Sequence, residues 1–570
     1  MDASTAPGLA SVSAALAGSG GAGVMTAGNM LLEAAAEAGY YGLMTRTSGP
    51  QIRGGEAAAM LRISGFATDA QDDGFQILLA MDWQNVGRFA AELPLGPDSL
   101  IVGDPAQGEP PEVFTRSGAR YAPVPLKALA AEVNGGWPNM VALGLAAALM
   151  RLPQQALEAA MRRAMKKGLD AGLAAARLGM REAAALPGFA LAGPPRTSPR
   201  WLITGNEAAG YGALRGGVRF VAAYPITPAT ELLEYLAPAL AGIGGTLVQA
   251  EDELASINMA LGASFGGVPA LTATSGPGLS LMLESLGLGV AAEVPVVVVD
   301  VMRTGPSTGI ATKSEQADLG AAIYGLHGDA PHVVIAPNSL ADCIAATEWA
   351  VGLAESLQVP AIVLADQYLG QARGVVEAPA AGAAPAKRLT ATAGAESYRR
   401  YALTASGVSA MAIPGTPGTT YTADGLEHNE QGTPSSQASD HLAQMDKRAR
   451  KLAGLDPGDA WASVEGTGDT AIVTFGSCTS PAREAIARAG GGFRLISVRM
   501  LSPAQPARLA QALQGVKRVL VLEQNHSGQF LRYLRGEYVL PGEVHSLRRP
   551  GPLPFRPAEI QAALSSRSPA

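Results

Sequence analysis

Three acidic residues at a predicted helix start, Glu251, Asp252 and Glu253, are the first candidates for acid–base chemistry. The sequence from 247 to 280 predicts a short strand, this acidic helix start, a helix ending at a Gly-Gly pair, a second strand (ALTAT) and a tight turn (SGPG). Acids in a first helical turn usually only complement the helix dipole. Glu253 differs from its neighbours because it stands nine residues before Gly262, with small residues between them. Glu253 is therefore the candidate proton-transfer group, and Glu251 is the alternative.

Two further segments carry groups that suit a carboxylate ligand. In YPITP (224–228) Thr227 is predicted to cap a helix that begins at the next residue, where a hydroxyl and free N–H groups favour an anion. Arg303 follows an apolar run (294–301) typical of a fully buried strand, so it is placed to hold a carboxylate in the crevice of a parallel sheet. Lys313, ten residues on, is a candidate for a second carboxylate. The capping role of Thr227 is compatible with ligand binding, whereas a surface ion pair is the alternative for Arg303.

A glycine-rich turn, GSGGAG (18–23), joins a predicted strand at 11–16 to a helix. Such turns favour anionic groups, but they also occur simply where a helix approaches a sheet closely. No acidic residue stands about 20 positions on, as a dinucleotide site would require, so NAD binding is not expected. The following segment, RTSGPQIRGG (46–55), supplies two arginines on a predicted loop that could hold phosphate or carboxylate. The candidate residues are Gly20, Gly21, Gly23, Arg46 and Arg53.

Together, the pattern around Glu253, the YPITP segment and RTGPSTG (303–309) resemble the α chain of 2-oxoacid:ferredoxin oxidoreductases. The GSGGAG turn and the loop ending in RGG are similar to the γ domain of that family, fused here at the N-terminus. The resemblance implies that Glu253 activates the pyrimidine of thiamine diphosphate, and that Thr227 and Arg303 position the carboxylate of a 2-oxoacid. It places the N-terminal glycines and arginines near coenzyme A. The implied cofactor-binding residues are Tyr224, Pro225, Ile226, Glu253, Ser275, Gly276 and Gly278.

Two features that a complete enzyme of this kind needs are missing from the sequence. No Gly-Asp-Gly segment is present to begin a diphosphate- and metal-binding domain, and the two cysteines cannot supply a four-cysteine cluster. We therefore expect a partner β subunit to hold the Mg²⁺, the diphosphate and a [4Fe-4S] cluster. The resemblance implies a dimer of αβ heterodimers that passes electrons to ferredoxin and uses coenzyme A as cosubstrate.

Composition sets the fold class and the number of domains. A chain of 570 residues is too long for one core, and 48% hydrophobic with only 16% charged residues favours buried parallel sheets under Ala-rich helices. We expect a multidomain α/β protein. The predicted parts are a γ-like domain (1–190), a doubly wound pyrimidine-type domain that binds thiamine diphosphate (200–375), a connecting segment that wraps partner subunits (376–460) and a transketolase C-terminal-like domain (461–570).

The net charge of −7 and the lack of basic runs argue against nucleic-acid binding, and no apolar run reaches the roughly 20 residues of a membrane span. Cysteine usage fits a reducing cytoplasm. The leading hypothesis is a coenzyme A-dependent 2-oxoglutarate:ferredoxin oxidoreductase subunit. Pyruvate and branched-chain 2-oxoacids, a non-redox thiamine-dependent decarboxylase and a non-catalytic assembly subunit remain alternatives, and the direction of turnover stays open.

Overall fold

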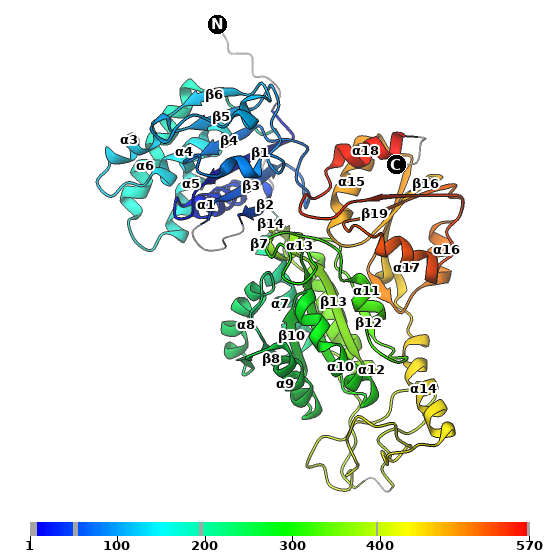
Figure 1. The fold of residues 1–570 in the computed structure, drawn as a ribbon. Coiled ribbons are helices and arrows are strands. Elements are labelled where there is room, and N and C mark those ends of the chain that lie inside the picture. The colour runs from blue at the N-terminus through cyan, green and yellow to red at the C-terminus, as the bar shows by residue number, and fades with distance from the viewer. Residues whose placement is uncertain (1–7, 50–54, 193–197, 383, 395–396, 567–570) are drawn as a thin grey trace. The chain divides into compact units, whose positions relative to one another are not determined.

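The computed structural model describes residues 8–49, 55–192, 198–382, 384–394 and 397–566. They form three β-sheets with helices packed around them, which confirms the predicted multidomain α/β class (Figure 1). The chain divides into two compact units: the first contains residues up to 204, 371–379 and 555–560, and the second contains the remainder. In the described part of the chain, no helix combines the length and the apolar character needed to cross a membrane.

The first unit is built on an eight-stranded mixed sheet in the order β6-β5-β4-β1-β3-β2-β14-β7. Alternate residues of β1 point to opposite faces. Val12, Ala14 and Leu16 join one core with the helices, and Ala15 and Ala17 join a second core with Trp83. The strands are β1 (Ser11–Gly18), β2 (Tyr41–Ser48), β3 (Ala57–Ser64), β4 (Ile77–Ala80), β5 (Leu100–Gly103), β6 (Arg120–Pro123), β7 (Arg200–Thr204) and β14 (Arg373–Glu377). The helices are α1 (Val24–Glu37), α2 (Glu112–Thr115), α3 (Leu126–Ala131), α4 (Pro138–Leu149), α5 (Gln154–Ala164) and α6 (Leu169–Glu182).

Two strands of this sheet come from outside the predicted 1–190 interval. β14 pairs antiparallel with β2 on one side and with β7 on the other. The whole of residues 205–370 therefore lies between two hydrogen-bonded neighbours of the first unit's sheet. Sequence patterns do not reveal this arrangement, because the two pairing strands are separated by more than 160 residues.

The second unit contains a seven-stranded sheet in the order β18-β12-β13-β11-β10-β8-β9, parallel except for β18. β11 is buried at all seven positions, as its valine run predicts for a central parallel strand. Helices α7, α8 and α12 pack together, and α9 packs with α10. The strands are β8 (Phe220–Ala223), β9 (Thr246–Gln249), β10 (Ala270–Thr274), β11 (Val296–Met302), β12 (Val333–Ile335), β13 (Pro360–Asp366) and β18 (Met500–Ser502). The helices are α7 (Gly205–Gly216), α8 (Thr230–Gly242), α9 (Glu253–Phe265), α10 (Gly276–Ala291), α11 (Leu319–Tyr324), α12 (Asp342–Leu357) and α13 (Gln367–Gln371).

A five-stranded sheet, β15-β17-β16-β19-β20, forms the rest of the second unit. Buried amides join it to the seven-stranded sheet: Asn338 Nδ2 donates to the Ser497 carbonyl at 3.0 Å, and Asn338 Oδ1 accepts from the Gly476 amide at 2.9 Å. The strands are β15 (Ala462–Gly466), β16 (Thr470–Thr474), β17 (Phe493–Val498), β19 (Arg518–Glu523) and β20 (Glu543–Arg548). The helices are α15 (Thr479–Arg488), α16 (Pro506–Ala512), α17 (Gln529–Glu537) and α18 (Pro557–Ser565).

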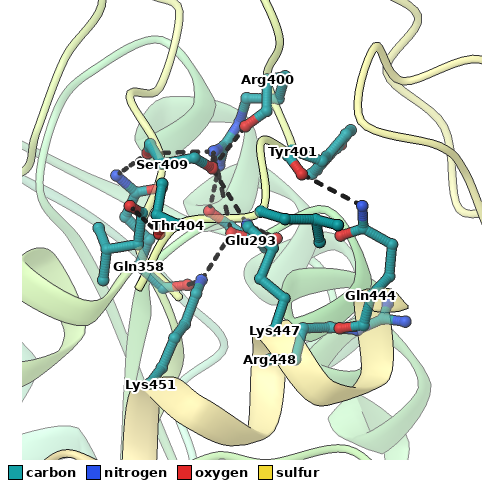
Figure 2. A network of polar contacts seen from close by, with 12 residues as sticks. Glu293, Gln358, Arg400, Tyr401, Thr404, Ser409, Gln444, Lys447, Arg448 and Lys451 are labelled. Atoms are coloured by element: carbon teal, nitrogen blue, oxygen red, sulfur yellow. Dashed lines mark hydrogen bonds and ion pairs between the residues drawn. The ribbon is translucent and has the colours of Figure 1, made fainter. Parts of the chain in front are cut away.

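The connecting segment is fixed to the second unit by a buried charge network (Figure 2). Its helix α14 (Ala438–Ala453) brings Lys447 and Lys451 onto the carboxylate of Glu293, with Lys451 Nζ 2.7 Å from Glu293 Oε2. Arg400, from the irregular part of the segment, donates to the Glu293 carbonyl at 2.7 Å. All four side chains are almost completely buried. The cations hold the pKa of Glu293 down at about 2 despite its burial, so its carboxylate remains charged.

Candidate active site at the carboxyl ends of the parallel strands

Four consecutive parallel strands deliver the predicted site residues to one edge of the seven-stranded sheet. β8, β9, β10 and β11 run in the same direction, so their carboxyl ends meet at a common edge. Thr227 follows β8, Glu253 follows β9, Ser275 follows β10 and Arg303 follows β11. In open α/β sheets this edge is where ligands bind.

Glu253 is the first residue of α9, and its side chain is buried although its acidic neighbours are exposed. Asp252 and Glu253 have different roles because they occupy different positions at the start of the helix. Asp252 is the N-cap, and its carboxylate accepts the Ala255 amide at 2.7 Å. Capping is thus done by Asp252, which leaves the Glu253 carboxyl available for a ligand.

The segment SGPG is the start of helix α10 and not the predicted tight turn. Ser275 is the N-cap and Pro277 lies in the first helical turn, where its missing N–H costs nothing. The two glycines have a packing reason. A Cβ on Gly278 would lie 2.6 Å from Glu253 Cγ, and a Cβ on Gly276 would lie 2.6 Å from the Asp318 carboxylate oxygens.

The hydroxyl of Ser275 takes no part in the hydrogen bonds of this helix start. Ser275 makes no side-chain capping bond, and its buried Oγ has no hydrogen-bond partner among the described residues. A buried hydroxyl without a partner is costly, so it is a candidate for binding a ligand.

The predicted cap at Thr227 is wrong. Residues 227–229 form a turn, helix α8 begins at Thr230, and Ala229 occupies the N-cap position. The Thr227 carbonyl instead accepts a 2.6 Å hydrogen bond from Arg303 Nη1, a contact over 76 positions that no local pattern reveals. Upstream of this turn, Tyr224 is exposed at the edge, while Pro225 and Ile226 are partly buried.

Arg303 is buried although it carries a full charge. Its Nη1 is bound to the Thr227 carbonyl, but its buried Nε has no hydrogen-bond partner among the described residues. Burial lowers the pKa of Arg303, and the charges of Asp318 and Glu253 oppose that shift. Lys313 lies partly buried in the loop after β11, and its carbonyl accepts the Thr304 amide at 2.8 Å. A guanidinium with an unused donor beside the Glu253 carboxyl suits a carboxylate ligand.

Two carboxyl groups near Arg303 were missed in the sequence. Asp300 lies in β11 opposite Thr274 of β10, it is completely buried, and neither of its oxygens has a hydrogen-bond partner among the described residues. Asp318 precedes α11, and its Oδ2 is likewise buried without a partner in the described chain. Asp300 could have been identified from the sequence, because it is the one acidic residue in the apolar run VVVVDVM. Nothing in the spacing of Asp318 reveals that it lies against Gly276.

The N-terminal candidates lie in the first unit. Gly21 and Gly23 have φ values of 92° and 79°, and a Cβ on Gly23 would collide with Asn139, so both glycines have structural reasons. The Ser19 amide donates to the carboxylate of Asp82, which places a negative charge beside the turn that was predicted to bind an anion.

The arginines that follow this turn were expected on a loop. Arg46 instead belongs to β2 and is exposed. It pairs with Ala59, which pairs with Leu16, so Arg46 stands two strands, about 10 Å, from the end of β1. Arg53 lies outside the described residues.

Over the described residues, no group of three or more His, Cys, Asp and Glu side chains is arranged to hold a metal ion. Burial raises the pKa of the Cys478 thiol well above its ordinary value, so Cys478 is a packed thiol. What this edge offers is a buried carboxyl, a buried hydroxyl and a buried guanidinium. This set fits the pyrimidine part of a thiamine cofactor and a substrate carboxylate.

Two family models match the chain. One, described as pyruvate flavodoxin/ferredoxin oxidoreductase, thiamine diphosphate-binding, covers residues 211–447, and one described as pyruvate ferredoxin/flavodoxin oxidoreductase covers 13–182. The 2-oxoacid:ferredoxin oxidoreductase subunit alpha of Sulfolobus sp. is 30% identical over 612 residues, and the alignment covers 96% of each chain. This chain belongs to the α-subunit family of 2-oxoacid:ferredoxin oxidoreductases. In this α subunit, the residues matched by the thiamine diphosphate-binding model include Thr227, Glu253, Ser275 and Arg303.

Two other relatives of this α subunit are informative. The 2-oxoglutarate oxidoreductase subunit KorA of Mycobacterium tuberculosis is 37% identical over 393 residues, which span 66% of this chain and 59% of that protein. The solved 2-oxoglutarate:ferredoxin oxidoreductase from Magnetococcus marinus, with 2-oxoglutarate, coenzyme A and succinyl-CoA bound, has a TM-score of 0.89 and 34% identity. That match covers 98% of this α subunit and 99% of the solved chain.

Proposed function

We propose that this chain is the α subunit of a 2-oxoglutarate:ferredoxin oxidoreductase. It carries out coenzyme A-dependent oxidative decarboxylation of 2-oxoglutarate to succinyl-CoA, reversibly, with ferredoxin as electron acceptor. The observation that carries the proposal is the meeting of Glu253, Ser275 and Arg303 at one strand edge, each buried, with the Arg303 Nε and the Ser275 hydroxyl unpartnered among the described residues. The 2-oxoglutarate relatives named above support the choice of substrate.

Thiamine diphosphate supplies the chemistry that breaks the bond between the carboxylate and the carbonyl carbon of the substrate. Glu253 would hold the ring nitrogen of the pyrimidine and exchange a proton with it, and Gly278 leaves room for the Glu253 side chain at this edge. Arg303 holds the substrate carboxylate through its free donors, with Thr227 fixing the guanidinium by its carbonyl. Tyr224, Pro225 and Ile226 line the same edge. Lys313 is our candidate for the second carboxylate of 2-oxoglutarate.

A partner subunit completes this site. We propose that a β subunit holds the diphosphate with its Mg²⁺ and the [4Fe-4S] cluster, in a dimer of αβ heterodimers in the cytoplasm. The chain has only two cysteines, and both are buried and remote in sequence, which supports placing the cluster on the partner. The N-terminal glycines with Arg46 and Arg53 remain our candidate contact for coenzyme A.

The test is reduction of a low-potential viologen dye by the chain alone and by the chain co-expressed with its β partner, using a panel of 2-oxoacids. We expect reduction only by the complex, dependent on coenzyme A and fastest with 2-oxoglutarate. A higher rate with pyruvate, which has no second carboxylate, would contradict the substrate and leave the reaction class intact. Dye reduction by the lone chain would contradict the shared site.

A further inference from the structure

One positive charge at the site edge faces several carboxyl groups. Burial lowers the pKa of Arg303, and the charges of Asp318 and Glu253 both oppose that shift. Asp300 stands three residues before Arg303, inside β11. If all three acids were ionised, the group that they form with Arg303 would carry a net charge of −2 before any substrate carboxylate arrived. An anionic substrate would then be repelled, so the protonation states of these acids decide whether it binds.

Asp300 is the acid that keeps its proton. Complete burial in β11 and the charge of Asp318 raise the pKa of Asp300 well above its ordinary value. Both of its oxygens lack hydrogen-bond partners in the described chain, so nothing there stabilises a carboxylate. Asp300 is therefore neutral and does not balance Arg303.

Asp318 is the acid whose charge can change. Its carboxyl packs against Gly276 at the start of α10, it is only partly buried, and it does not cap the helix that follows it. Burial and the charge of Glu315 raise the pKa of Asp318 to about 6, while the charge of Arg303 opposes the shift. The groups that face it are Asp300, Glu315 and Arg303.

We propose that Asp318 balances the charge of Arg303 in the substrate-free enzyme and takes up one proton when the carboxylate of a 2-oxoacid binds to Arg303. The proton comes from solvent and stays on the Asp318 carboxyl, so the net charge around Arg303 is the same before and after binding. Asp318 is a positioning residue, because its protonation state determines whether the charge of Arg303 is available to the substrate carboxylate. This inference rests on the proposed function of Arg303.

The direction in which KM changes with pH follows from the linkage between proton binding and substrate binding. Below about pH 6 Asp318 already carries its proton, and substrate binding needs no uptake. Above that pH each binding event takes up one proton, so the KM for 2-oxoglutarate rises by about tenfold per pH unit until the pKa of Asp318 in the substrate complex is reached. The value of kcat is much less affected, because Asp318 acts before chemistry begins.

The direct measurement is the number of protons taken up on ligand binding by the assembled αβ complex with thiamine diphosphate. Titration calorimetry with glutarate, which carries both carboxylates but no reactive carbonyl, is run above the pKa of Asp318 in two buffers of different ionisation enthalpy. We expect uptake of about one proton per site in the wild type and none in Asp318→Asn. Glu315→Gln is the matched control, since it removes a neighbouring carboxyl but should keep the uptake.

The pH profile of KM gives a second, independent measurement. Asp318→Asn should lower KM at alkaline pH and remove its dependence on pH. Binding of glutarate by the wild type without proton uptake, or an unchanged pH profile in Asp318→Asn, would overturn the inference. In either case an active complex would still support the proposed function, whereas a complex with no 2-oxoacid-dependent dye reduction would refute the function itself.

Discussion

The adjacent acids Asp252 and Glu253 at the start of α9 have different roles, because only Glu253 is buried. Asp252 satisfies the helix start from the exposed side, while the Glu253 side chain lies inside the strand edge against Gly278. Their separate contributions can therefore be measured by changing one at a time.

Glu253→Gln in the assembled complex should lower the rate by at least about 100-fold, because the amide cannot exchange a proton with the cofactor ring. Its stability should stay close to that of the wild type, since the change preserves shape. Asp252→Ala should show the reverse, with a loss of about 0.5–2 kcal/mol of unfolding free energy and most of the activity retained. Dye-reduction rates and denaturant unfolding measure the two effects, and full activity in Glu253→Gln would contradict the assignment.

Gly278→Ala is expected to abolish activity, because the new Cβ would lie 2.0 Å from Thr274 Oγ1 and 2.6 Å from Glu253 Cγ, so the Glu253 side chain would be displaced. Gly287→Ala, on the same helix, is the control. A Cβ there would meet its nearest neighbour, His327 Cε1, at 3.6 Å, an ordinary contact, and alanine favours the helix by about 0.5–1 kcal/mol. Equal activities of the two variants in the dye assay would mean that the glycine is not needed for the Glu253 geometry.

At the scale of elements, the buried residues of α14 are mostly polar or charged: Gln444, Lys447, Arg448, Lys451 and Leu452. Three buried cations surround the single carboxylate of Glu293, and burial lowers the pKa of Lys447 to about 7 even though Glu293 opposes the shift. The arrangement depends on one negative charge.

Glu293→Gln should therefore destabilise the protein by about 3–5 kcal/mol, because it leaves buried cations without a counter-charge. Glu284→Gln, an exposed position on α10, should change stability by less than about 0.5 kcal/mol. Thermal or denaturant unfolding distinguishes the two. A Glu293→Gln protein as stable as the wild type would show that the lysines are neutral in the folded state.

Elements defined by local patterns were predictable. β11 (Val296–Met302) lies within two residues of the apolar run 294–301 that predicted it, because a strand buried on both faces is hydrophobic almost throughout. The start of α8 was misplaced, because the turn at Thr227 is held by Arg303 from another strand. In the site, the spacing of Glu253 to Gly262 was informative, whereas Asp318 meets Gly276 only through the fold. Pairings such as β12 with β18 are equally invisible to sequence patterns.

At the scale of the whole molecule, an apolar surface beside the site is left uncovered by the described residues. Leu254 and Met259 on α9 and Leu281 on α10 are 48%, 44% and 50% exposed. These two helices begin at the site edge, so a subunit that completes the site would cover them.

Leu254→Glu should weaken assembly with the β partner and reduce dye reduction at low protein concentration, while the chain alone stays folded. Val539→Glu is the control, because Val539 is 89% exposed in the five-stranded part and far from α9 in sequence. Size-exclusion chromatography of the co-expressed pair at several concentrations measures the effect. Unchanged assembly of Leu254→Glu would place the partner on another surface.

The pairing of β7 with β14 has a consequence for how the protein is made. A ribosome that has delivered residues 1–204 has supplied only seven of the eight strands of the first sheet, and the missing one belongs between two strands already synthesised. Residues 205–370 must emerge before that gap can be filled. The sheet of the first unit is thus completed only after residues 205–370 of the second unit have been translated. Until β14 emerges, the nascent sheet has a gap between β2 and β7.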